Sequence, residues 1–300
     1  MRSQTDTPPG GYSFGTGRPA AERLLVVARV FGPVLARVLG DLPPRRWSTA
    51  VDLGCGPGSS TADLVRLLRT DRIVGVDASP AFVRAARGRV PGAAFVVGDV
   101  TRPLPIARPD LLYARFLLSH LPRPLEVAAG WVAQLGGGGH LVLEEPERID
   151  TDDPTFRRYL RLTTGAVASR GATMLVGPTL AAIGPGDLPP GAQLVVNRAV
   201  EHPVAAADAA TMFALNLASL RDDPSVRARW TARALDDLAD RLDRIRTSPT
   251  DAGAPHPPVV WQVRQVVVAA TDGARPTHPS ADRRTDRCTG VPGGDQGAEG

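Results

Sequence analysis

The sequence predicts an α/β fold: a doubly wound, mostly parallel seven-stranded sheet with an antiparallel last strand and a helical cap insertion. Between residues 45 and 145, short apolar runs alternate with segments of helical periodicity. The first apolar run ends in a glycine-rich loop at residues 54–58, and a Val-rich run follows much later at residues 259–270. Strands that alternate with helices at this spacing form βαβ units, whose right-handed crossovers place helices on both faces of the sheet.

The first half of the chain supplies five strands and four helices of this fold. Residues 19–39 carry apolar side chains at helical spacing, and Pro43 and Pro44 end that helix. Residues 49–53 form the first strand, and Ser59 or Ser60 can cap the helix after the glycine-rich loop. We expect the remaining strands at residues 72–77, 93–97, 110–114 and 140–144, and the remaining helices at residues 59–68, 80–90 and 124–135.

The pattern changes after residue 145, where helical segments dominate. A long helical region at residues 153–183 is interrupted near Gly171 and Gly177, and we interpret residues 154–183 as a cap over the cleft at the strand ends. We expect a strand at residues 193–200, helices at residues 206–220 and 225–246, and the final strand at residues 259–270.

Composition disfavours several classes of partner. The net charge is +4, but the Arg residues are interspersed with Asp and Glu, and aromatic residues make up only 5%. A nucleic-acid-binding protein more often carries a clustered basic face, so we expect no nucleic-acid partner. The two cysteines, Cys55 and Cys288, form no disulfide or metal-binding pattern, which favours the reducing cytoplasm and predicts no metal site. Since no signal peptide and no uninterrupted apolar span is present, we expect no membrane association.

Polar residues follow the predicted strands at the points where those strands end. They are Asp52, Asp77, Asp99, Arg115 and Glu144. Ligands of parallel α/β sheets bind beyond the carboxyl ends of the strands. The sequence therefore predicts a ligand site built from these residues and the glycine-rich loop.

The residues in and before the glycine-rich loop favour a positively charged ligand over a dinucleotide. Gly54, Gly56 and Gly58 can turn tightly and let a ligand approach the backbone. Asp52, at the end of the strand that precedes the loop, would repel a dinucleotide pyrophosphate by roughly 4 kcal/mol per charge pair at an effective dielectric near 20. The dinucleotide fingerprint also requires a third glycine where this chain has Ser59. A ligand with positive charge is therefore favoured.

Three segments carry a family resemblance. Residues 51–58 (Val-Asp-Leu-Gly-Cys-Gly-Pro-Gly) resemble the first motif of the class I, Rossmann-like S-adenosylmethionine-dependent methyltransferases of small-molecule type. Residues 74–79 resemble the acidic second position of that family, and residues 97–100 resemble its adenine-contacting position. The resemblance covers residues 20–145 well and extends loosely to residues 259–270, the place of the family's final antiparallel strand.

The resemblance implies S-adenosyl-L-methionine as the cofactor and assigns its contacts. Gly54, Gly56 and Gly58, with Cys55 between them, would line the methionine and ribose, and Asp52 would lie near the methionine amino group. Asp77 would accept from the ribose hydroxyls and Asp99 from the adenine amine. The remaining predicted contacts are Ala78, Phe82 and Val100, around the adenine ring, and Arg115, whose backbone would flank the cofactor.

The implied function is methyl transfer to a small-molecule acceptor by in-line displacement. His120 is the first candidate for a general base, with a pKa expected near the working pH, and Glu144 is the second. Glu145, directly after Glu144, is an equal alternative to it, either as a base or as a residue that binds a polar group of the substrate. Two alternatives stay open: an NAD(P)-dependent oxidoreductase, and a non-catalytic S-adenosylmethionine-binding regulator. A homodimer is compatible with the sequence.

The predicted organisation is one methyltransferase domain at residues 19–270, with its cofactor half at residues 45–145. Residues 1–18 are expected to form a flexible segment, or a flap in which Tyr12 and Phe14 cover the cofactor. Residues 271–300 contain almost no apolar side chains, which predicts a disordered tail.

Overall fold

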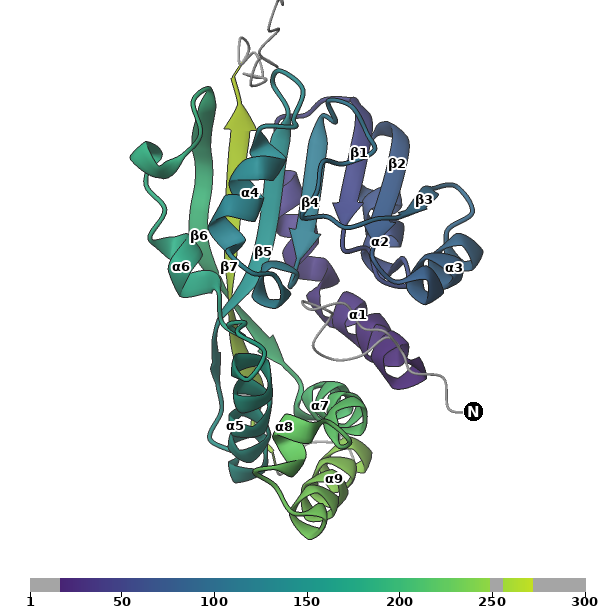
Figure 1. Ribbon diagram of the computed structural model, residues 1–300, viewed down its shortest axis with the longest axis vertical. Helices are drawn as coiled ribbons and strands as arrows, with labels where there is room; N and C mark the ends of the chain where they lie inside the picture. Colours follow the sequence, from purple (N-terminus) through teal and green to yellow (C-terminus); the bar gives the residue numbers. More distant parts are fainter. Residues whose placement is uncertain (1–16, 249–255, 272–300) are drawn as a thin grey trace, which may run out of the picture.

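The computed structural model describes residues 17–248 and 256–271 (Figure 1). The predicted flap residues Tyr12 and Phe14, and Cys288 in the predicted tail, lie outside these described residues.

A seven-stranded sheet forms the centre of the structure, in the order β3-β2-β1-β4-β5-β7-β6. The strands are β1 (Trp47–Leu53), β2 (Thr70–Asp77), β3 (Ala94–Val97), β4 (Leu111–Arg115), β5 (His140–Asp150), β6 (Ala192–Val204) and β7 (Val259–Ala270). Strands β1 to β5 pair in parallel, whereas β7 runs antiparallel to both of its neighbours, β5 and β6. The predicted mostly parallel sheet with an antiparallel last strand is thus confirmed.

Helices cover both faces of this sheet. They are α1 (Arg18–Gly40), α2 (Ser59–Leu67), α3 (Pro80–Arg89), α4 (Pro124–Val132), α5 (Pro154–Ala168), α6 (Gly177–Ala181), α7 (Ala206–Leu220), α8 (Pro224–Arg227) and α9 (Ala232–Thr247), with 3-10 turns η1 (Leu118–His120) and η2 (Pro185–Asp187). One core packs α1 and α2 on the sheet around Leu35, Leu64 and Tyr113. The opposite core packs α4 and α6 around Trp131 and Leu180, so the sheet is doubly wound as predicted.

A helical lobe made of α5, α7, α8 and α9 lies beside the sheet, at the end toward which the arrowheads of β1 and β4 point (Figure 1). Its core contains Tyr159, Phe213 and Leu238, and the same apolar cluster continues into Trp261 of β7. The carboxyl ends of the parallel strands therefore face this lobe. Helices α5 and α6 fall in the predicted cap region, and the role of that region as a cap stays a prediction.

Several predicted boundaries are wrong: β6 runs to Val204 instead of residue 200, and α4 ends at Val132 instead of residue 135. Strand β5 does not end at residue 144 but continues to Asp150, because its ladder with β7 persists past a register shift between Pro146 and Arg148. The helix predicted over residues 225–246 is divided into α8 and α9, because Thr231 caps a new helix through its hydroxyl, which accepts from the Ala234 N–H at 3.2 Å.

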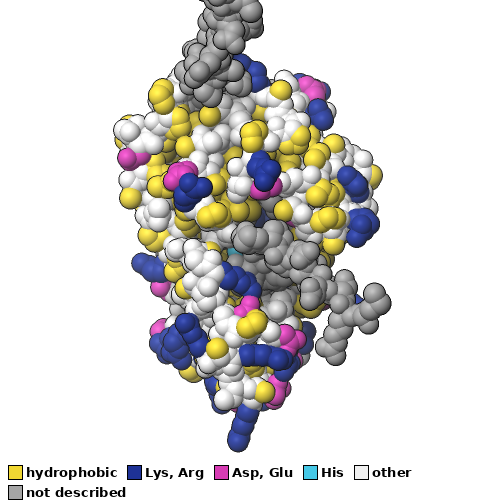
Figure 2. Space-filling view, in the orientation of Figure 1, with side chains coloured by type: hydrophobic (Ala, Val, Ile, Leu, Met, Phe, Trp, Pro, Cys, Tyr) yellow, Lys and Arg dark blue, Asp and Glu magenta, His cyan; other side chains and the backbone are white. Residues whose placement is uncertain are grey.

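Charged side chains of both signs are intermixed over the helical lobe on the face that Figure 2 shows. Ion pairs such as Arg221–Asp236 at 2.7 Å and Arg241–Asp237 at 3.1 Å account for part of this mixture. Among the described helices, none combines the length and the apolar character that a membrane span requires.

Candidate functional site

The glycine-rich loop between β1 and α2 turns through the left-handed region at each of its glycines. Gly54 has φ 64° and Gly58 has φ 85°, values that L-residues with a side chain rarely adopt. A Cβ atom at Gly54 would also lie 2.7 Å from Cδ1 of Leu117, and one at Gly58 would lie 3.0 Å from Cβ of Ala86. Both positions therefore require glycine for conformation and for space.

Cys55 in the same loop has a packing role. Its side chain is buried beside Phe95 and Val83, and its thiol lies 3.7 Å from the carbonyl oxygen of Gly56. Burial raises the pKa of the thiol far above its usual range, so the group stays protonated and is a poor nucleophile.

Asp52, the residue two before the loop's first glycine, is buried at 1% exposure. Its Oδ2 atom accepts from the hydroxyl of Ser60 at 2.7 Å and from that of Thr61 at 2.6 Å, both at the start of α2. Burial raises the pKa of Asp52 to about 6, although the two hydroxyls and the guanidinium of Arg115 lower it. At neutral pH a negative charge is thus fixed under the loop.

Asp77 is the last residue of β2, and its carboxylate contacts the backbone of the glycine-rich loop. Its Oδ2 atom accepts from the Gly56 N–H at 2.9 Å, and its Oδ1 atom accepts from the Ser79 N–H at 2.8 Å. Burial raises the pKa of Asp77, while these two N–H groups lower it. Each oxygen keeps a second lone pair that can accept from a hydroxyl group.

Asp99 lies beside Asp77 at the neighbouring strand end, because the Gly98 N–H donates to the Asp77 carbonyl at 3.0 Å. Its carboxylate is half exposed and accepts from the Thr101 hydroxyl at 2.7 Å. That hydrogen bond, together with Arg102, lowers the pKa of Asp99. Of the predicted adenine neighbours, the side chain of Ala78 is exposed, whereas Phe82 and Val100 are buried.

Glu144 lies inside the sheet and not at the cleft edge, since β5 extends beyond it. Both of its carboxylate oxygens have partners: the Tyr113 hydroxyl donates at 2.7 Å and the Gln265 side-chain amide at 2.9 Å. Burial raises its pKa. The adjacent strand contributes Arg115, whose Nη1 atom is buried and has no hydrogen-bond partner among the described residues. The catalytic role of Glu144 stays a prediction that this enclosed position does not favour.

His120 ends the 3-10 turn η1 and is buried at 8% exposure. Burial, together with the positive charges of Arg23 and Arg170, lowers the pKa of its imidazole to about 3. The expectation of a pKa near the working pH is therefore wrong. The ring is neutral at pH 7 and is a weak base.

Glu145, the alternative to Glu144 in the sequence, lies at the same edge as His120. Its carboxyl group is fully buried and accepts from the backbone N–H groups of Leu117 and Leu118, both at 2.7 Å. Burial raises its pKa to about 8. The pair Glu144-Glu145 was visible in the sequence, but both faces of a central strand are buried, so no polarity pattern separates the two residues.

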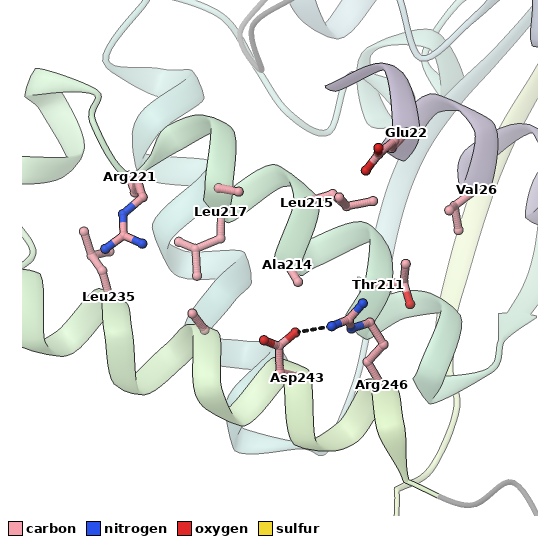
Figure 3. A pocket seen from close by; sticks show the side chains of 12 residues that line it. Glu22, Val26, Thr211, Ala214, Leu215, Leu217, Arg221, Leu235, Asp243 and Arg246 are labelled. Atoms are coloured by element: carbon pink, nitrogen blue, oxygen red, sulfur yellow. Dashed lines mark ion pairs between the residues drawn. The ribbon is translucent and has the colours of Figure 1, made fainter. Parts of the chain in front are cut away.

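A groove of about 480 Å³ lies apart from the glycine-rich loop, between α1, α7 and α9 (Figure 3). Its walls include Leu215, Leu217 and Leu235, and an Asp243–Arg246 ion pair at 2.9 Å lies on one side. It contains none of the predicted site residues, so the carboxylates at the strand ends, and not this groove, define the candidate site.

Sequence comparison identifies relatives of part of the chain. Residues 51–143 match the methyltransferase domain family. The trans-aconitate 2-methyltransferase of Methylobacterium radiotolerans is 35% identical over 167 residues, which are 56% of this chain and 54% of the relative. That of Methylobacterium nodulans is 38% identical over 129 residues, which are 43% of this chain and 48% of the relative. The chain spans about half the length of these curated relatives.

Solved structures share the fold at low identity. A proposed methyltransferase from Bacillus halodurans superposes with a TM-score of 0.50 and 14% identity, covering 80% of this chain and 98% of that chain. The (4+2)-cyclase SpnF superposes with a TM-score of 0.50 and 15% identity, covering 88% of this chain and 99% of that chain. At these identities the likeness concerns the fold alone.

Proposed function

We propose that this chain is a class I S-adenosylmethionine-dependent methyltransferase that transfers a methyl group from S-adenosylmethionine to a small-molecule acceptor, a proposal that the match of residues 51–143 to the methyltransferase domain family supports. The observation that carries this proposal is the set of three carboxylates, Asp52, Asp77 and Asp99, arranged around a glycine-rich loop at neighbouring strand ends. Such a set suits a ligand that combines positive charge, a ribose and an amine-bearing base.

The residues present fit this cofactor. The loop is tightly packed, since a Cβ at Gly54 would collide with Leu117, and its three glycines place no side chain of their own between the loop backbone and a ligand. Asp77 would hold the ribose hydroxyls with its unused lone pairs, and Asp52 would attract the ammonium group. When bound, the cofactor supplies a methyl group on a positively charged sulfur, which a nucleophile displaces in line.

We propose a small carboxylic acid as the acceptor. Two of the relatives above are named for methylation of trans-aconitate, an acid of this class. In this chain, Arg23 and Arg170 impose positive potential on His120, and such potential attracts a carboxylate. A carboxylate is already a nucleophile at neutral pH, so neither His120 nor Glu144 needs to accept a proton from it.

Two alternative functions have less support. A nicotinamide dinucleotide would bring its pyrophosphate to the loop beside the buried Asp52, where like charges repel. A regulator that holds the cofactor without reaction would bind it but release no methylated product. The fold alone does not separate these, since the cyclase SpnF shares it.

Calorimetric titration with S-adenosylmethionine, S-adenosylhomocysteine and NADH tests the cofactor. We expect micromolar binding of the first two, lost in Asp77→Ala and kept in Asp71→Ala, an exposed carboxylate on the same strand that pairs with Arg46. Transfer of an isotopically labelled methyl group to trans-aconitate and other small acids tests the acceptor. Binding of NADH alone would overturn the proposal, and cofactor binding without transfer to any small acid would favour the regulator.

A further inference from the structure

The chain turns sharply after β4, and this turn packs against the glycine-rich loop at one end and carries His120 at the other. Phe116 begins this turn at φ 52°, in the left-handed region that L-residues disfavour. Its N–H still donates to the Glu144 carbonyl at 2.8 Å, so the chain leaves the sheet abruptly at this residue. Its ring is held between Phe31, at 4.9 Å between centroids, and Trp261, at 5.8 Å. The turn is thus a strained feature that its surroundings must hold in place.

The N–H groups that follow Phe116 are bound by a single carboxyl group. Leu117 and Leu118 open the 3-10 turn η1, where backbone N–H groups have no partner within the helix. Glu145 of β5 accepts from both through the same Oε1 atom, at 2.7 Å each. Since Glu145 is 0% exposed, water cannot replace it as the acceptor.

The residues at both ends of this turn lie at the candidate site. The side chain of Leu117 fills the space next to Gly54, so that a Cβ there would lie 2.7 Å from Cδ1 of Leu117. At the other end, the His120 N–H donates to the Leu117 carbonyl at 2.9 Å. A shift of the turn would therefore displace both the wall of the glycine-rich loop and the imidazole of His120.

We propose that Glu145 is a positioning residue: by binding the Leu117 and Leu118 N–H groups, it holds the turn from Phe116 to His120 against the glycine-rich loop and so shapes the cofactor and acceptor sites together. This inference rests on the proposed methyl transfer for its functional part. It assigns no contact between Glu145 and the acceptor.

Two substitutions of Glu145, by side chains of nearly equal size, test the contribution of the oxygen that accepts the two hydrogen bonds. Glu145→Gln keeps an oxygen for the two N–H groups, whereas Glu145→Met keeps the length and apolar stem but accepts no hydrogen bond. Glu147→Gln is the control, because Glu147 lies two residues further along β5 and pairs with Arg264 at 2.5 Å instead of binding the turn. Each variant is studied well below its midpoint of thermal unfolding, so that all three are folded.

Three measurements distinguish positioning from a general contribution to stability. In Glu145→Met we expect the rate of amide hydrogen exchange at Leu117 and Leu118 to rise roughly 10- to 100-fold. We expect the Kd for S-adenosylhomocysteine to rise about 10-fold or more. Both ranges follow from the loss of hydrogen bonds to a buried acceptor. We expect kcat to fall as well, since the turn forms part of the proposed cofactor and acceptor sites and its shift would misalign the two. Glu145→Gln should restore all three values to within about 3-fold of the wild type.

Two results would overturn the inference. One is a Glu145→Met variant whose midpoint of unfolding falls while the two amides stay protected and the Kd is unchanged, since the carboxyl group would then contribute only to the core. The other is a rise in the Kd for S-adenosylhomocysteine in Glu147→Gln that equals the rise in Glu145→Met. The effect would then come from any change in β5 and not from the hydrogen bonds of Glu145. If the wild type binds no S-adenosylhomocysteine, the proposed function fails, and the exchange data alone decide whether Glu145 holds the turn.

Discussion

Replacement of Glu145 by Gln should make the protein's stability less sensitive to a rise in pH between about 4.5 and 8. Burial raises the pKa of this carboxyl from an ordinary 4.5 to about 8 in the folded chain. Between these two values the unfolded chain has lost the proton and the folded chain has kept it. The free energy of unfolding therefore falls as pH rises through this window, and it stops falling above the folded pKa.

The size of this effect follows from the two pKa values. They differ by about 3.5, since 8 minus 4.5 is 3.5, and each pKa unit corresponds to about 1.36 kcal/mol. The wild type should thus lose up to about 5 kcal/mol between pH 4.5 and pH 8.5 through Glu145 alone. Glu145→Gln cannot ionise, so the difference in unfolding free energy between variant and wild type should grow by this amount across the window.

Urea unfolding followed by circular dichroism, at steps of half a pH unit, measures this difference, because contributions shared by the two proteins cancel. Asp71→Asn serves as a control that should stay constant, because the hydrogen bond from Arg46 lowers the pKa of Asp71 from an ordinary 3.8, so its stabilising effect is lost only at pH values below this window. A difference for Glu145→Gln that stays constant within about 0.5 kcal/mol from pH 4.5 to 8.5 would refute the reasoning.

Three further outcomes are expected. Gly54→Ala should cost about 1–2 kcal/mol or more from its positive φ and its clash with Leu117, and it should abolish S-adenosylhomocysteine binding; thermal unfolding and calorimetry measure the two effects. The His120 imidazole, with a pKa of about 3 against an ordinary 6.5, should show no NMR titration between pH 5 and 8; its stabilising effect is present above pH 6.5 and is lost as pH falls toward 3. Tyr113→Phe should cost about 1–3 kcal/mol in urea unfolding, because one buried oxygen of Glu144 loses its donor.

The sheet and the segment at residues 45–145 could be predicted from the sequence because the patterns that mark them are local. Each predicted parallel strand is a short apolar run, and the glycines at residues 54–58 mark the first strand-to-helix turn directly. The end of β5 was not readable, because Pro146 reads as a strand end. What keeps the strand going is its ladder with β7, more than a hundred residues away, and the irregularity after Pro146 accommodates the missing N–H.

Part of the candidate site could be predicted from the sequence for the same reason. Asp52, Asp77 and Asp99 follow local strand signals, and the structure brings them to one edge. The chemistry of Glu144 and His120 was not readable, because it depends on long-range burial: Gln265 reaches Glu144 from β7, and Arg23 of α1 acts on His120. Ionisation in a protein interior is set by neighbours that sequence spacing does not reveal.

The ionisation of the site constrains the acceptor. A base that takes a proton in catalysis works best with a pKa near the operating pH, and His120 lies far below it, while both oxygens of Glu144 are engaged inside the sheet. Glu145 has a pKa of about 8, but it is fully buried and its Oε1 atom is bound to the turn after β4, so it is not placed to reach an acceptor. A site without a suited base must gain its rate from alignment, for which effective molarities of about 10⁵ to 10⁸ M are available. Alignment suffices only for an acceptor that is a nucleophile before it binds. A carboxylate meets this condition at neutral pH and an alcohol does not, so the weak basicity of the site and the positive potential at His120 favour the same class of acceptor.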